Sequence, residues 1–404
     1  MPLHFKYVGA FFLYVFINTA TVFPKSDIKP VETKEIKTLP KKMVPNVNTK
    51  APLNVRVLLD EGTTQKEWHL SSPGGFVLWN PDNPQKKIKS RSDDIVIRVT
   101  DGQLYLGKQC FTQERVYLKP YHDMSFVNGN GYHGAFLIEQ AANRTMFINC
   151  LDLEDYVFSV LGTESLPGWP LEVQKVFAII CRSYVISMAI RAKKNKLPYH
   201  IKNTNEHQTY SGLHTNALMA RAVQDTKGIF LAYKNEPILA MYDVCCGGII
   251  PAHIAGFDFQ KAPYLARKYA CTYCKGCRAY SWKTELELSA VERKLKQKFC
   301  NLTKLTNVTV NKKDKAGLVR EVICKDKKRT EKLSGRQMRA LFSPIKSFCF
   351  EIQKKAHKVI VSGRGFGHHM GLCQWGAREM VRDGWNYRRI LSFYYPGIDF
   401  KQLV

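Results

Sequence analysis

The stretch Gly363–Ala377 constrains the fold of this chain more than any other, and it reads G-R-G-F-G-H-H-M-G-L-C-Q-W-G-A. Four of its first nine residues are glycine, and they are interspersed with an arginine, a phenylalanine and two histidines. Glycine lets the backbone take positive φ angles and lets another chain approach closely. We therefore predict a folded-back loop whose backbone surface lies against a polar ligand.

The N-terminus has the pattern of an export signal. Residues 7–23 carry no charge, and they lie between Lys6 and Lys25. The run is short for a membrane span of ~20 residues, and it contains polar residues. We interpret residues 1–23 as a signal peptide or an N-terminal membrane anchor. This predicts a protein exported to the cell envelope that touches a membrane only through this segment.

A linker and a strong positive charge follow from composition. Residues 24–50 contain seven lysines and four prolines, which is typical of an extended, solvated linker. The chain has a net charge of +27, which favours a polyanionic partner. Lysine and arginine are spread along the whole chain, and no nucleic-acid-binding motif is evident. An acidic cell envelope explains the charge, and we expect no nucleic acid partner.

The order of the predicted elements indicates an α+β fold. Short strands such as 55–59, 95–99 and 134–138 fill the region up to about residue 149. Apolar spacing and capping residues then predict helices over 152–161 and 170–193. Further helices are expected over 215–227, 284–299 and 374–383. We predict a folded region over 51–401, with a basic insert at about 281–350 and a cleft between the β-rich and helical parts.

Glu164 is the candidate acid. It is predicted to lie in the turn between two helices, before the run L-P-G-W-P at 166–170. An acid that protonates a glycosidic oxygen must hold its proton near neutral pH. Apolar neighbours such as Leu166, Pro167 and Trp169 raise a carboxyl pKa by disfavouring the charged form. On spacing alone, a lone glutamate before a helix is usually a helix cap or a solvated charge.

The glycine-rich stretch resembles, nearly residue for residue, the C-terminal signature of the stage II sporulation protein D (SpoIID) family, whose characterised members are peptidoglycan lytic transglycosylases. The resemblance covers about residues 52–401, although most of the basic insert matches poorly. The other matching motifs are L-E-D-Y-V at 153–157, E-S-L-P-G-W-P at 164–170, A-I-I-C-R-S-Y at 178–184, Q-T-Y-S-G at 208–212, C-C-G-G at 245–248 and P-Y-L at 263–265.

The resemblance implies a role for each matching residue. Glu164 would protonate the MurNAc–GlcNAc bond and then accept a proton from the C6 hydroxyl of the same sugar, which leaves 1,6-anhydroMurNAc ends. No cofactor is required, and the substrate would be glycan strands, those stripped of peptide stems among them. The resemblance also implies substrate contacts from Arg182, Ser183, Tyr184, Gln208, Tyr210, Gly247, Gly248, Arg364, Gly365, Gly367, His368, Gln374 and Trp375.

Five of the twelve cysteines crowd into residues 245–277. Cys271, Cys274 and Cys277 have the spacing C-x2-C-x2-C, which suits ligands of one zinc ion, and Cys245 or Cys246 would complete a tetrahedron. The same residues can instead form disulfides in an oxidising envelope. Export favours disulfides over zinc, so Cys246, Cys271, Cys274 and Cys277 stay candidate metal ligands.

Other classes of function remain open on the sequence alone. A wall-binding protein without activity of its own, which activates a cell-wall amidase, is one alternative. A muramidase that hydrolyses the same bond with water is another. Sporulation and cell division are both processes in which a wall is remodelled in this way.

Overall fold

Two β-sheets form the N-terminal part of the protein. The structure is a computed structural model that describes residues 53–403 apart from 63–64, 101–102, 112–113, 142–143, 205–206 and 301. The predicted signal segment (1–23) and linker (24–50) lie outside the described residues. Within them the chain is α+β, as predicted.

The first sheet has the strand order β13-β1-β12-β11-β8-β3-β4, and the second has the order β10-β9-β2-β5-β6-β7. Side chains of β5 alternate between the interior and the surface, as a half-buried strand requires, whereas β1 has a register shift after the consecutive buried residues Val57 and Leu58. The strands are β1 (Asn54–Gly62), β2 (Gln65–Ser71), β3 (Phe76–Asn80), β4 (Asn83–Ser90), β5 (Asp94–Thr100), β6 (Gln103–Leu106), β7 (Gln109–Phe111), β8 (Arg115–Pro120), β9 (Met124–Val127), β10 (Asn130–His133), β11 (Ala135–Ala141), β12 (Arg144–Asp152) and β13 (Ile201–Lys202). The three predicted strands are confirmed in β1, β5 and β11.

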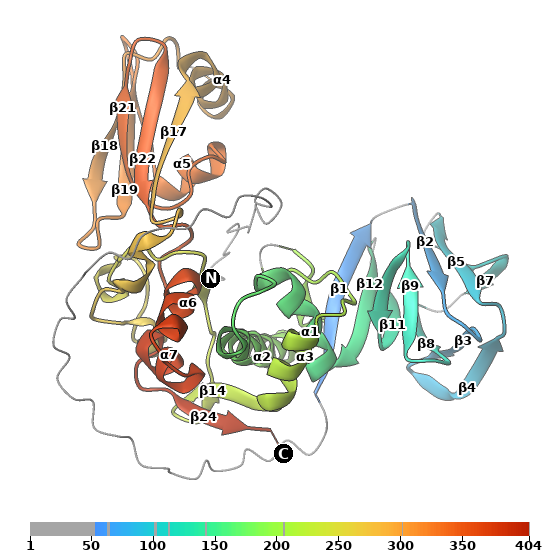
Figure 1. The fold of residues 1–404 in the computed structure, drawn as a ribbon. Coiled ribbons are helices and arrows are strands. Elements are labelled where there is room, and N and C mark those ends of the chain that lie inside the picture. Colours follow the sequence, from blue (N-terminus) through green and yellow to red (C-terminus); the bar gives the residue numbers. More distant parts are fainter. Residues whose placement is uncertain are drawn as a thin grey trace.

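Three helices pack beside the first sheet (Figure 1). They are α1 (Leu153–Glu164), α2 (Leu171–Lys194) and α3 (Ala217–Asp225). Asp152 caps α1 as predicted, because its side chain accepts a hydrogen bond from the backbone N–H of Glu154. Pro170 precedes the first residue of α2, where its missing N–H costs no hydrogen bond.

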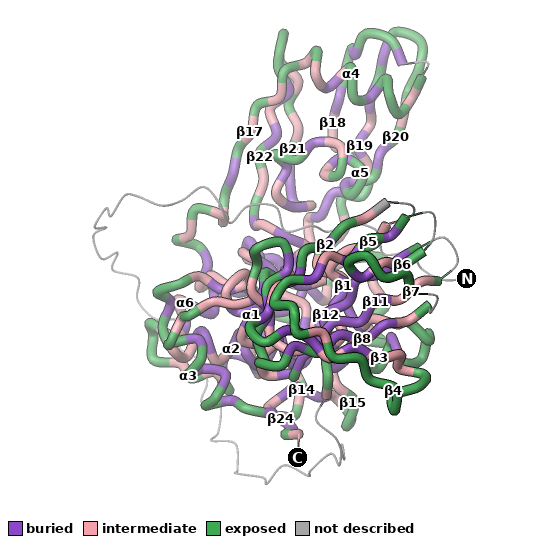
Figure 2. Tube along the Cα trace, turned by 90° about the vertical axis from the view of Figure 1, so that its right-hand side faces the viewer, coloured by how far each residue is buried: buried purple, intermediate pink, exposed green. Residues whose placement is uncertain are grey.

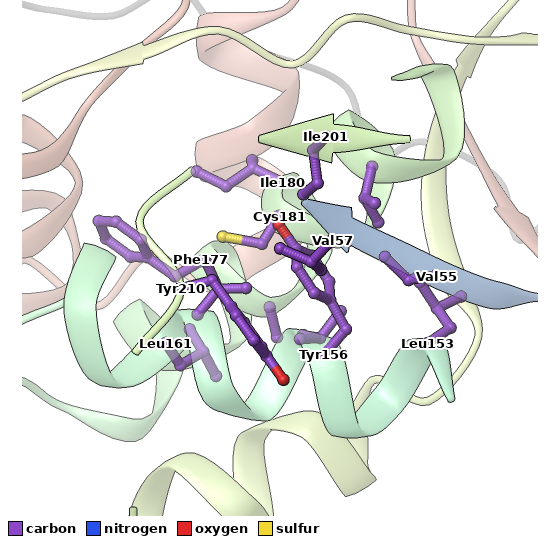
Figure 3. Packing of buried hydrophobic residues seen from close by; sticks show 14 of the residues in the cluster. Val55, Val57, Leu153, Tyr156, Leu161, Phe177, Ile180, Cys181, Ile201 and Tyr210 are labelled. Carbon is purple, nitrogen blue, oxygen red and sulfur yellow. The ribbon is translucent and has the colours of Figure 1, made fainter. Parts of the chain in front are cut away.

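Helix α2 is the centre of the hydrophobic core. Among the described residues it is the one helix long and apolar enough to cross a membrane, and 78% of its most apolar stretch is buried inside the protein. Figure 3 shows Phe177, Ile180 and Cys181 of α2 among side chains from α1, β1 and β13. Figure 2 shows the same distribution, with buried residues gathered along α2 and exposed ones on the outer strands.

The C-terminal part of the chain packs against helix α2. Strand β14 (Ile229–Tyr233) lies between β15 (Glu236–Pro237) and β24 (Asp399–Gln402). Helices α6 (Gln374–Arg382) and α7 (Tyr387–Tyr394) both contact α2. Strand β16 (Tyr242–Asp243) pairs in parallel with β23 (Leu372–Cys373), which brings two distant segments together. Three short 3₁₀ helices lie between them in sequence: η1 (Pro251–His253), η2 (Pro263–Leu265) and η3 (Tyr273–Gly276).

The predicted basic insert is a lobe with a hydrophobic core of its own. It stands away from the helices in Figure 1 and spans residues 281–364. Its elements are β17 (Ser281–Glu287), α4 (Leu288–Lys298), β18 (Asn307–Lys313), β19 (Val319–Lys325), β20 (Thr330–Leu333), α5 (Gly335–Leu341), β21 (Cys349–Lys354) and β22 (Lys358–Arg364). The predicted helix over 284–299 begins later, because residues 281–287 alternate in burial and pair with β22 as a strand.

Candidate active site

Glu164 is the last residue of α1, and Ser165 caps the helix C-terminus. The prediction that Glu164 lies in the turn between the helices is therefore corrected, because α1 runs past the predicted end at Leu161. Thr163 extends the helix by donating a hydrogen bond to the carbonyl of Val160 at 3.0 Å. The same hydroxyl contacts the carbonyl of Thr209 at 2.5 Å, which ties the helix end to the 208–212 loop.

The carboxyl group of Glu164 is held by hydrogen bonds from Thr209 and Tyr242. The backbone N–H of Thr209 donates to Oε1 at 2.7 Å. Burial raises the pKa of Glu164 above its ordinary value, although the Thr209 amide and the Tyr242 hydroxyl act in the opposite direction. The half-buried carboxyl is therefore biased towards the protonated form that an acid catalyst requires.

Trp169, one of the apolar residues predicted to lie near Glu164, is buried in the connection between α1 and α2. Trp169 packs against Trp375, with ring centroids 5.6 Å apart, and stiffens the connection between α1 and α2. Tyr242 on β16 and Cys181 on α2 also interact with Glu164; Cys181 is fully buried, whereas Tyr242 is half-buried. Tyr242 was missed by the sequence reasoning. Its only local signal is the acidic Asp243 in an otherwise apolar run.

Gln374 joins the site from the C-terminal region. Its side-chain amide donates a hydrogen bond to the backbone carbonyl of Glu164 at 3.2 Å. Gln374 begins α6 directly after β23, so the pairing of β23 with β16 brings it to the end of β16. The glycine-rich motif and the candidate acid thus meet, as the resemblance implied.

Four predicted substrate contacts are instead buried structural residues. Gln208 accepts a hydrogen bond from the Tyr156 hydroxyl at 3.0 Å, and Tyr210 donates one to Asn149 at 2.5 Å. Both side chains have almost no exposed surface, so they cannot touch a glycan. They instead fix the position of the loop that carries Thr209. The other two, Arg182 and Ser183, also lie fully inside the protein.

Arg182 makes a buried ion pair. Its guanidinium binds Glu154 through Nε–Oε1 at 2.9 Å and Nη2–Oε2 at 2.5 Å. It also donates to the carbonyl of Ile229 at 2.9 Å, which links α1, α2 and β14. Ser183 donates to the carbonyl of Ile179 and accepts from the N–H of Leu231. The neighbouring Tyr184 is half-buried, and burial raises the pKa of its hydroxyl.

The glycine-rich loop folds against this chain's own backbone. Asp243 accepts hydrogen bonds from the backbone N–H groups of His368, at 2.7 Å, and His369. A Cβ at Gly367 would lie 2.0 Å from Asp243 Oδ1, and one at Gly371 would lie 1.8 Å from the carbonyl of Met241. These two glycines are therefore required by the contact with residues 241–243. The predicted role as a surface for a ligand is not needed to explain them.

The other residues predicted to contact substrate differ in how far they are exposed to solvent. Gly365 and Gly247 are buried against each other, where Cys245 and Phe366 exchange two backbone hydrogen bonds. Gly248 is half-buried beside the Tyr280 hydroxyl. The candidate side chains with surface available to a ligand are Tyr184, Arg364, His368, Gln374 and Trp375.

Asp243 and His368 add an electrostatic feature beside the site. The carboxylate lies 3.3 Å from His368 Nδ1. Burial raises the pKa of Asp243 to about 6 and lowers that of His368 to about 3. Near neutral pH the pair therefore consists of a neutral imidazole and a carboxylate that binds the loop N–H groups.

Four cysteine sulfurs gather behind the glycine-rich loop. Cys246, Cys271 and Cys274 of the predicted group come together, and the fourth member is Cys373. Cys277 lies outside this cluster, with its sulfur 3.4 Å from that of Cys245. Cys373 was missed because it is far along the chain and carries no spacing motif. All twelve cysteines are free thiols in the structure.

The chain is similar to known proteins over the regions that build this site. Residues 141–233, which hold α1, α2 and the 208–212 loop, match the stage II sporulation protein (SpoIID) family, and residues 265–371 match a domain of unknown function, DUF8618. An uncharacterized protein of Brachyspira hyodysenteriae is 30% identical over 278 residues, which are 68% of this chain and 73% of that protein.

Other relatives carry descriptive names. The stage II sporulation protein D of Bacillus subtilis is 23% identical over 285 residues, which are 66% of this chain and 78% of the relative. The amidase enhancer of Bacillus subtilis is 25% identical over 284 residues, but these make up 59% of this chain and 39% of the relative.

Proposed function

The chain belongs to the SpoIID family, and from this premise we propose that it is an exported lytic transglycosylase acting on peptidoglycan glycan strands, with Glu164 as both acid and base. The observation that carries the proposal is the half-buried Glu164 carboxyl at the end of α1, whose pKa is raised by burial. Such a carboxyl holds a proton at higher pH than a solvated one, which general acid catalysis requires.

In the proposed reaction the protonated carboxyl donates its proton to the MurNAc–GlcNAc oxygen as the C1–O bond breaks. The Thr209 N–H, 2.7 Å from Oε1, then stabilises the resulting carboxylate. The carboxylate then accepts the proton of the C6 hydroxyl, and the oxygen of that hydroxyl forms a bond to C1. The products are a 1,6-anhydroMurNAc end and a free GlcNAc hydroxyl, and no water is consumed. One carboxyl group therefore serves both steps.

The charge of the protein supports this substrate. A net charge of +27 favours binding to the acidic polymers of a cell envelope. We infer that the signal segment takes the protein across the membrane to that substrate. High salt is expected to weaken the attraction between the protein and the wall, because it screens exposed charges.

A second candidate function rests on the similarity to an amidase enhancer. In that function the protein binds the wall and activates an amidase partner without cutting glycan strands itself. A muramidase that adds water to the same bond is a third candidate, with Glu164 as its acid.

Product analysis tests the proposal. Purified protein is incubated with denuded and with intact glycan strands, and the new ends are identified by mass spectrometry. We expect 1,6-anhydroMurNAc ends. Reducing ends that have gained water would instead identify a hydrolase. No cleavage of either substrate would favour the amidase-activating function.

The cleavage rate is also expected to depend on pH. Because the free enzyme must carry a protonated Glu164, kcat/KM should fall as pH rises through the pKa of that group. Burial raises this pKa above the ordinary value of 4.5, so the descending limb should lie above pH 4.5. A pH–rate profile on soluble denuded strands measures it. A limb at or below pH 4.5 would contradict Glu164 as the acid.

A further inference from the structure

We propose that Cys246, Cys271, Cys274 and Cys373 form a structural zinc site. Their sulfur atoms all lie within 4.8 Å of one another, and all four residues are buried. They come from three segments: the turn after β16, the C-x2-C pair Cys271 and Cys274 that leads into η3, and the end of β23. The site would join the glycine-rich loop to two segments that precede it by about a hundred residues.

The geometry of the sulfurs suits one tetrahedral ion. With Zn–S bonds of about 2.3 Å, a regular tetrahedron places its sulfurs about 3.8 Å apart. Cys246 and Cys274 have a separation of 3.7 Å between their sulfurs. A disulfide joins one pair at about 2.05 Å and needs no third or fourth sulfur nearby. Four mutually close sulfurs are therefore the arrangement of a metal site.

Hydrogen-bond donors point at the sulfurs. The backbone N–H groups of Cys246 and Gly376 both donate to Cys373 Sγ at 3.3 Å. The Tyr394 hydroxyl lies 3.2 Å from Cys271 Sγ. Cys373 also occupies the N-cap of α6, where the helix dipole favours negative charge. Such donors stabilise metal-bound thiolates and fix their orientation.

The backbone makes room for the cluster at Gly376. A Cβ at this position would lie 2.9 Å from Cys271 Sγ and 2.1 Å from the Tyr394 hydroxyl. This glycine is helical, so its conformation does not demand glycine. The requirement comes from the close approach of the sulfur and the hydroxyl that contacts it.

A buried cation supplies independent support. Arg267 has no exposed surface; among the described residues it makes no salt bridge, and its guanidinium donates hydrogen bonds to the backbone carbonyls of Tyr269 and Ile249. Its guanidinium lies 5.7 Å from the centroid of the Tyr394 ring, whose hydroxyl contacts Cys271. A buried charge needs a counter-charge nearby. Zinc bound by four thiolates carries two negative charges, and it would supply the counter-charge that Arg267 otherwise lacks.

Zinc binding has a direct consequence for its neighbours. Four thiols release their protons when they bind Zn²⁺, so affinity should fall as the medium becomes acidic. Cys373 is followed at once by Gln374, whose side chain binds the carbonyl of Glu164. The metal would hold this residue in place without touching substrate. The proposal goes beyond the proposed function and does not depend on it.

Metal analysis of the purified full-length chain tests the site. We expect one zinc per chain by inductively coupled plasma mass spectrometry, and X-ray absorption should show four sulfur ligands. Replacing zinc by Co²⁺ should produce the thiolate-to-cobalt absorption bands of a tetrahedral site. These measurements use the unaltered protein, so they need no variant to fold and no enzymatic activity.

Matched cysteine variants locate the ligands. Cys373→Ser is expected to lose the zinc, whereas Cys277→Ser and the exposed Cys110→Ser should keep it. Purified chain with less than a tenth of one zinc, and with disulfides among the four cysteines by peptide mapping, would overturn the proposal. So would zinc that is lost in Cys277→Ser but kept in Cys373→Ser. A failure of glycan cleavage alone would count only against the proposed function.

Discussion

Replacing Glu164 by glutamine is expected to lower the rate of glycan cleavage by about 10²- to 10⁴-fold, the usual contribution of a general acid. Glutamine keeps the shape of the side chain, and its carbonyl oxygen can still accept the Thr209 N–H that lies 2.7 Å from Oε1. It cannot donate a proton to the leaving oxygen and take one back from the C6 hydroxyl. The measurement is the initial rate of release of 1,6-anhydro products from denuded strands.

A matched control separates chemistry from charge. Glu236→Gln removes the same charge from an exposed position on β15, and it should leave the cleavage rate unchanged. If Glu164→Gln cleaves glycan strands as fast as the parent protein does, Glu164 is not the catalytic acid.

Stability distinguishes a lost acid from a damaged fold. Because burial raises the pKa of Glu164 in the folded state, the folded protein binds this proton more tightly than the unfolded chain does. The stabilisation is complete below the unfolded pKa and is lost as pH rises through the folded pKa. Above the folded-state pKa the ionised carboxylate lowers the free energy of unfolding, so Glu164→Gln should unfold no more easily than the parent protein at those pH values. If Glu164→Gln is inactive but as stable as the parent protein, its loss of activity comes from the missing acid and not from a damaged fold.

The second large effect is expected on stability, at the buried ion pair. Arg182→Met should lower the free energy of unfolding by about 3–5 kcal/mol, because it leaves a mostly buried carboxylate without its cation. The side chain of Arg182 has 0% exposure and that of Glu154 has 18%. Glu154 also accepts the N–H of Gly228 at 3.0 Å, so the disturbance should spread to the start of β14. Chemical denaturation measures the change.

An exposed ion pair provides the comparison. Arg221 on α3 has a side chain that is 69% exposed, and it lies 3.8 Å from Asp225. Arg221→Met should change the free energy of unfolding by less than about 1 kcal/mol, as is usual for surface pairs. A double variant with Glu154→Gln should recover part of the loss of Arg182→Met, since the uncompensated charge is then removed. Equal losses for Arg182→Met and Arg221→Met would refute the structural role of the pair.

Local rules predicted the helices well. Asp152 and Pro170 mark the starts of α1 and α2, and the apolar spacing along 173–188 identifies α2. The end of α1 was predicted less well, because its last turn is held by Thr163 and the distant Thr209. The start of α4 was misplaced for the same kind of reason: residues 281–287 become a strand by pairing with β22. Pairing partners that lie far along the chain leave no trace in local spacing.

Sequence by itself determined the helix boundaries set by caps, the fold class, and the candidate acid through its motif. It also placed two cysteines of the cluster, Cys271 and Cys274, close together through their spacing. Only the tertiary structure decided that Arg182, Gln208 and Tyr210 face the interior. Only the tertiary structure brings Tyr242 and Gln374 to Glu164. It also identifies Cys373 as the fourth cysteine of the cluster. The physical reason is that spacing constrains contacts within one element, whereas the parallel pairing of β16 with β23 brings together residues that are remote along the chain.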